Sequence, residues 1–135
     1  MGDYENTLRD IESTLGAVPG FMRALPEDVL VHDWALMRKY QFGESVIPQK
    51  YREMIGLAVA ANIKCPYCEA LHLAMAKGYG ATEEELSELD YLASFTSRWS
   101  AMIHAQHYDM DTFKEEAERI GKHLEQRSKV AQPLR

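Results

Sequence analysis

The sequence has little that would place the protein in a membrane or on a nucleic acid. Its longest uninterrupted apolar run, Met54 to Ala61, has eight residues, far fewer than the roughly 18 that a membrane-spanning helix needs. Acidic residues outnumber basic ones, 21 to 15, and the formal net charge is −6, which argues against nucleic-acid binding. The first ten residues are acidic and polar, unlike a secretory signal. We therefore expect a cytoplasmic protein with no membrane or nucleic-acid partner.

Cysteine is also scarce, since Cys65 and Cys68 are the only two among 135 residues. A pair three positions apart cannot cross-link distant segments as the disulfide framework of a small secreted domain does. Without a secretory signal, a CxxC pair indicates either thiol–disulfide chemistry or half of a metal site.

Apolar residues recur at helical spacing along the whole chain, and no segment alternates as a strand would. We predict an all-α fold of six or seven helices with a central antiparallel hairpin. A single domain is expected over residues 1–126, followed by a flexible basic tail over 127–135. Residues 17–20 are expected in a turn. The predicted helices cover about 6–15, 26–42, 48–63, 66–77, 83–93, 96–106 and 112–126.

Two segments carry the pattern of a capping box, in which a Ser or Thr caps a helix and a glutamate three positions later reaches back. They are Thr82–Glu85 and Thr112–Glu115. We expect a helix to begin at each.

The CxxC pair lies where a helix is expected to begin, because Pro66 suits the first helical position. Residues three apart on a helix are neighbours, so Cys65 and Cys68 can form and break a disulfide with little backbone movement. The attacking species is a thiolate. The helix dipole favours a thiolate at Cys65, whereas His72, one turn beyond Cys68, is placed to hydrogen-bond the Cys68 sulfur. These spacings leave open which cysteine attacks.

Glu53 is expected beside His72. If the helices at 48–63 and 66–77 pack antiparallel, Glu53 lies level with residues 73–75, and Cys65 lies about 15 Å further along the axis. A carboxylate beside a thiolate disfavours the anion, so Glu53 suits a role in accepting a proton or orienting His72. A relay Glu53–His72–Cys68 fits both spacings. Taken alone, Glu53 is also typical of a solvated acid in the second turn of a helix.

A metal site is the main chemical alternative, because the two cysteines, His72 and Glu53 are all residue types that bind zinc. Structural zinc usually has a second ligand pair, for which His104 and His107 are candidates. An ordinary helix surface or a subunit contact is the more common role of two such histidines. A third alternative is a binding or assembly module whose dithiol only senses redox state.

Glu53, Cys65, Cys68 and His72 form the pattern Glu-x11-Cys-x2-Cys-x3-His. It resembles that of the alkylhydroperoxidase D-like group of the carboxymuconolactone decarboxylase family. Every fixed position is matched, and the likeness extends over about residues 19–126. Four residues at fixed spacing, together with the helices expected to carry them, make five matching elements. Such a combination is far more specific than CxxC alone.

The resemblance implies an all-helical subunit that assembles into a homo-oligomer, a trimer or hexamer, with its redox site near a subunit interface. It implies that Cys68 attacks a peroxide, that Cys65 resolves the product, and that Glu53 and His72 relay protons. One position between the two cysteines differs from the founding member of the group. The founding alkylhydroperoxidase has a relay histidine just before its second cysteine, where this chain has Tyr67, which either covers the dithiol or packs.

The family's lactone decarboxylases lack the cysteine pair, so the resemblance favours reduction of a hydroperoxide or a disulfide over decarboxylation. No nicotinamide or flavin fingerprint is visible in the sequence. We therefore expect no bound cofactor and no metal, and an external dithiol-donor protein that reduces the Cys65–Cys68 bond.

Overall fold

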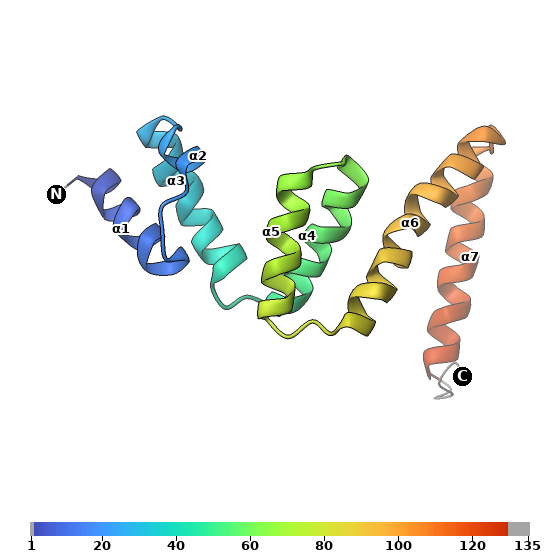
Figure 1. Cartoon of the computed structure of the whole chain (residues 1–135). Coiled ribbons are helices and arrows are strands. Elements are labelled where there is room, and N and C mark those ends of the chain that lie inside the picture. Colours follow the sequence, from blue (N-terminus) through green and yellow to red (C-terminus); the bar gives the residue numbers. More distant parts are fainter. Residues whose placement is uncertain (1, 130–135) are drawn as a thin grey trace. The chain divides into compact units, whose positions relative to one another are not determined.

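The computed structural model describes residues 2–129, and every regular element within this range is helical. Figure 1 shows the elements in chain order. They are α1 (Asp3–Leu15), α2 (Gly20–Arg23), α3 (Glu27–Met37), the π-helical segment η1 (Arg38–Phe42), α4 (Gln49–Ile63), α5 (Pro66–Gly78), α6 (Glu83–Ala105) and α7 (Met110–Lys129). The predicted all-α fold is confirmed over these residues, with seven α-helices. None of the helices described is long and apolar enough to span a membrane.

The chain divides into two compact units, one up to Ala93 and the other from Ser94 onward. The first unit contains all four residues of the Glu-x11-Cys-x2-Cys-x3-His pattern. Its largest buried cluster lies among α1, α2 and α3 and comprises Ile11, Met22, Leu30 and Trp34.

Trp34 anchors this cluster because both parts of its side chain have partners. Its indole ring lies 5.6 Å from the ring of Phe42, and its Nε1–H donates to Asp10 Oδ2 at 2.7 Å. A buried indole N–H without a partner would be costly, so Asp10 joins α1 to α3 by satisfying it.

The start of α4 is tied to the end of η1 by polar side chains of α4. Arg52 donates through Nη1 to the Tyr40 carbonyl at 2.5 Å and through Nη2 to the Gly43 carbonyl at 2.7 Å. Gln49 donates to the Phe42 carbonyl at 2.6 Å. The last carbonyls of a helix lack partners within it, so α4 supplies them here.

α4 and α5 form the predicted antiparallel hairpin, joined by only two residues (Figure 1). Lys64 ends α4 in the left-handed conformation, at φ 59° and ψ 44°, which is uncommon for a residue with a side chain. The Cys65 N–H then donates back to the Ala60 carbonyl at 3.1 Å. This short turn sets the register of α5 against α4, and with it the residues that face one another across the hairpin.

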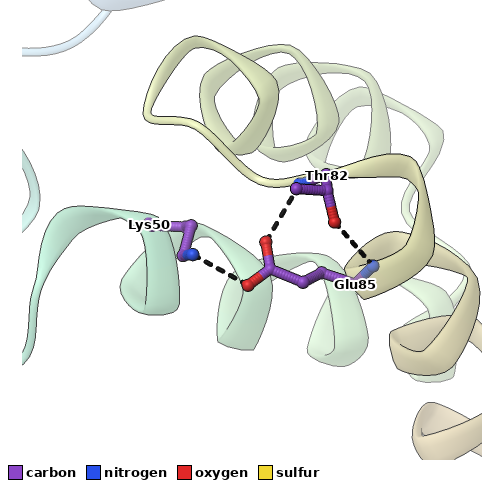
Figure 2. Close-up of polar contacts among 3 residues, drawn as sticks. All are labelled: Lys50, Thr82 and Glu85. Atoms are coloured by element: carbon purple, nitrogen blue, oxygen red, sulfur yellow. Dashed lines mark hydrogen bonds and ion pairs between the residues drawn. The ribbon is translucent and has the colours of Figure 1, made fainter.

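The capping box at Thr82–Glu85 is present as predicted. The Glu85 N–H donates to Thr82 Oγ1 at 3.1 Å, and the Thr82 N–H donates to Glu85 Oε2 at 2.9 Å. The other carboxylate oxygen of Glu85 accepts from Lys50 Nζ at 2.8 Å, as Figure 2 shows. Glu85 therefore joins the first turn of α6 to the first turn of α4.

We expect Glu85→Gln to lower the melting temperature slightly at neutral pH and not in acid. The hydrogen bond from Lys50, and then that from the Thr82 N–H, holds the pKa of Glu85 below its ordinary value of 4.5. A carboxyl with a lower pKa in the folded chain stabilises the fold above its unfolded-state pKa. That stabilisation is lost as the pH falls through the folded-state pKa. Melting curves from about pH 7 down to about pH 3 measure it.

Glu84→Gln is the matched control, since Glu84 is an exposed carboxylate in the same turn. It should change the melting temperature less than Glu85→Gln does at neutral pH. A loss for Glu85→Gln that is equally large in acid would show that the lost stability does not come from the ionised carboxylate of Glu85.

Two predicted helix boundaries near the C-terminus are wrong. The helices expected at 83–93 and 96–106 are one continuous helix, α6. No glycine or proline lies near the expected break, and residues such as Ser94 and Thr96 cost little inside a helix. The box expected at Thr112 is absent, because Asp109 Oδ2 accepts from the Thr112 N–H at 2.8 Å and caps α7 three residues earlier.

Part of the predicted tail is helical. Residues 127–129, expected to begin a flexible segment, are the last three residues of α7. Residues 130–135, the remainder of that tail, lie outside the described residues.

Candidate active site

The candidate site begins at the N-terminus of α5, where Cys65 and Cys68 are joined by a disulfide with their Cα atoms 5.3 Å apart. Cys65 is the N-cap, and Pro66 occupies the start of the helix. The Cys68 N–H donates to Cys65 Sγ at 3.2 Å, so this sulfur takes the place of the usual capping oxygen. The N-cap and first turn of α5 therefore hold both sulfurs within bonding distance.

Both cysteines are half-buried, whereas Tyr67 between them is 86% exposed. The Tyr67 ring is therefore not part of a core within its own unit. It stands beside the disulfide at the surface, where it is available to a substrate or a partner protein.

Glu53 and His72 meet across the hairpin. His72 Nδ1 lies 2.6 Å from Glu53 Oε2, and the exposed fraction is 1% for the Glu53 side chain and 21% for that of His72. A carboxylate can only accept, so Nδ1 carries the proton, a tautomer that we assign from this contact. Nε2 is then free to take up a proton when the imidazole is neutral.

Glu53 is the one buried charged residue among those described. Its second oxygen, Oε1, is buried without a hydrogen-bond partner. Leaving a buried polar group unsatisfied typically costs about 1–3 kcal/mol. A catalytic role is one of the reasons for which such a group is retained in a native structure.

The contact between His72 and a sulfur is not formed in this disulfide state. Within residues 2–129, no hydrogen bond joins His72 to Cys65 or Cys68. His72 nevertheless follows Cys68 by one turn of α5, so both lie on the same side of that helix. A disulfide sulfur carries no charge to attract an imidazole, whereas a thiolate does.

The remaining metal-ligand candidates lie away from the CxxC region in sequence and belong to the second unit. His104 Nδ1 is hydrogen-bonded to the Ser100 carbonyl at 2.8 Å, and His107 follows the end of α6 at φ 49°. Among the residues that the structure describes, no three His, Cys, Asp or Glu side chains are placed to hold a metal ion.

A groove of about 810 Å³ lies among α4, α5 and the first half of α6, and sequence reasoning did not find it. Two of its lining residues, Pro66 and Glu69, are sequence neighbours of the cysteines. Most of the others are apolar, namely Leu57, Ala58, Ala61, Ala70, Leu73, Leu86, Leu89 and Ala93. The recurrence of Leu57 and Ala61 four positions apart was the available signal, but it reads equally well as an ordinary packed face.

Three known proteins or families are similar to this chain. Residues 29–108 match the model of the carboxymuconolactone decarboxylase family. The crystal structure of an alkylhydroperoxidase AhpD core from Rhodospirillum rubrum has a TM-score of 0.71 and 26% identity, covering 82% of this chain and 84% of that one. An uncharacterized protein 4 in cox locus from Paracoccus denitrificans is 29% identical over 69 residues, which are 51% of this chain. The aligned region covers only 62% of that relative.

Proposed function

Because this chain belongs to the carboxymuconolactone decarboxylase family, we propose that it is a dithiol oxidoreductase that reduces organic hydroperoxides. The observation that carries the proposal is the Glu53–His72 pair, which lies one helical turn from the Cys65–Cys68 disulfide. A CxxC pair alone fits many redox roles. A buried acid hydrogen-bonded to an imidazole adds what a thiol needs in order to react, a group that removes its proton.

The proposed reaction consumes one hydroperoxide and two thiols. His72 Nε2 takes the proton of the Cys68 thiol, and the thiolate attacks the outer oxygen of the hydroperoxide. The O–O bond breaks, the alkoxide leaves with a proton from His72, and Cys68 becomes a sulfenic acid. The Cys65 thiol then displaces water and forms the disulfide. An external dithiol protein reduces that bond by thiol–disulfide exchange. The products are an alcohol, water and the oxidised donor.

The groove beside α5 supports an organic rather than an inorganic peroxide. Its lining is mainly apolar, and apolar surface gains from covering the hydrocarbon part of a substrate. Hydrogen peroxide has no such part.

The proposal also covers the oligomeric state of the protein and the compartment in which it works. α4 exposes Tyr51, Ile55, Val59 and Ile63, which recur every four residues along one face and are 48–66% exposed. Such a face favours contact with another subunit, so we propose a homo-oligomer, trimeric or hexameric. Turnover needs a reducing donor, which the cytoplasm provides.

We expect each reduced chain to lose both of its thiols when it consumes one molecule of organic hydroperoxide. Stopped-flow measurement of peroxide loss, with thiol titration before and after, tests this expectation. Adding a dithiol donor should convert the single turnover into continuous turnover. Thiols that survive an excess of hydroperoxide would refute the proposal.

A disulfide substrate is the second candidate, and the observation that favours it is Tyr67. This residue replaces the relay histidine of the founding alkylhydroperoxidase and is 86% exposed beside the redox pair, where it can contact a protein substrate. In this case the reduced protein would reduce a protein disulfide and leave the hydroperoxide unconsumed.

A further inference from the structure

We propose that Gly56 is a positioning residue that lets the His72 imidazole lie against α4, an inference that rests on the proposed function. A Cβ atom at position 56 would lie 2.5 Å from Cε1 of His72, 2.6 Å from Nε2 and 2.7 Å from Nδ1. All three distances are far below van der Waals contact, so no side chain fits between α4 and the ring.

The three nearly equal distances also describe how the ring lies. A Cβ meeting the edge of the ring at Cε1 would be clearly farther from the two nitrogens. The ring therefore turns a face toward Gly56. It lies flat on the backbone of α4, with Nδ1 directed to Glu53.

Backbone conformation does not explain this glycine. Gly56 lies inside α4 and has no positive φ, since the described glycines with positive φ are Gly16 and Gly80. Glycine within a helix is normally less favourable than alanine. What distinguishes Gly56 is close approach, because a Cβ at Gly121, inside α7, would meet nothing within 4 Å.

Glu53 and Gly56 together position the His72 ring. They are three positions apart on α4 and therefore lie on the same face. Glu53 holds Nδ1 through its carboxylate, while Gly56 permits the approach that makes this bond possible. A methyl group at position 56 must displace the ring, since the ring is the movable end of its side chain. Glu53 Oε2 would then lose its hydrogen-bond partner. Because Oε1 already has none, both oxygens of the carboxylate would be unpaired.

The test is a double-mutant cycle of Gly56→Ala and His72→Ala, with Gly121→Ala as the control for helix propensity. His72→Ala should slow hydroperoxide reduction by about 100-fold, which is the typical effect of losing an acid–base group. Gly56→Ala should fall within about threefold of that rate. The double variant should be no slower than His72→Ala, because Gly56 acts only through the ring. Gly121→Ala should react at the wild-type rate.

Two readouts are independent of activity. With nitrogen-15-labelled histidine, the Nδ1–H resonance of the Glu53-bonded ring should be present in the wild type and lost in Gly56→Ala. In thermal melts, Gly56→Ala should lower the melting temperature more in the wild type than in His72→Ala. The His72→Ala protein has no ring for the new methyl group to displace. If Gly56→Ala fails to fold, recovery of folding in the double variant supports the proposal by the same reasoning.

A wild-type rate or an unchanged Nδ1–H resonance in Gly56→Ala would overturn the inference. So would a double variant about tenfold slower than His72→Ala, which would mean that Gly56 acts apart from the ring. Failure of the proposed function is a different result: a wild-type protein that does not consume hydroperoxide, with the resonance and the thermal cycle still deciding the role of Gly56.

Discussion

Cys68→Ser is expected to abolish hydroperoxide reduction, with a loss of about 1,000-fold or more, because a serine hydroxyl cannot replace a thiolate nucleophile. Cys65→Ser, a matched change three residues away, should behave differently. It should consume one equivalent of hydroperoxide and then stop, since Cys68 can still be oxidised but no thiol is left to form the disulfide. The measurement is a stopped-flow burst, with mass spectrometry of the oxidised cysteine.

The opposite pattern would assign the attack to Cys65. That possibility has a physical basis, because Cys65 caps α5 and a helix N-terminus stabilises an anion. Cys68 is half-buried in the first turn and has His72 one turn further along. The two single variants therefore decide between stabilisation by the helix dipole and proton removal by the imidazole.

Glu53→Gln is expected to slow turnover by about 100-fold while leaving the fold nearly as stable as the wild type, within about 1 kcal/mol. Glutamine has the same shape, and its carbonyl oxygen can still accept from His72 Nδ1. The second oxygen of Glu53 already lacks a partner, so an unpaired amide in its place adds little cost. What is lost is the negative charge 2.6 Å from His72 Nδ1, which faces the ring while it holds the proton of the thiol.

The readouts are the pH dependence of the single-turnover rate and a thermal melt. Glu88→Gln is the control, because Glu88 is an exposed glutamate of α6 and should alter neither. A wild-type rate for Glu53→Gln would mean that the Glu53 carboxylate is only structural. A slower reaction accompanied by a large drop in melting temperature would point to disruption of the hairpin rather than of the chemistry.

The meeting of Glu53 and His72 was predictable because it depends on few quantities. A two-residue turn between two helices sets their register, and each residue adds a known rise along the axis. The disulfide was predictable for the same reason, since both cysteines belong to one helix start. Each of these contacts follows from short-range geometry.

The errors have the opposite origin. The helices expected at 83–93 and 96–106 adjoin residues such as Ser94 and Thr96, which suit both a cap and a helix interior, and α6 continues through them. At α7 two acceptable caps compete, Asp109 and Thr112, and the chain uses the first. A local pattern cannot choose between two starts of similar energy.

By itself, the sequence determined the helical class, the turn between α4 and α5, and the set of residues that share the hairpin near the dithiol. These follow from periodicity, capping and spacing, which act over a few residues. Only the tertiary structure decided that Glu53 is 1% exposed and that the imidazole leaves no room for a side chain at Gly56. Burial and close approach depend on how near two helices lie, and an apolar run such as the one around Gly56 reads the same at any separation.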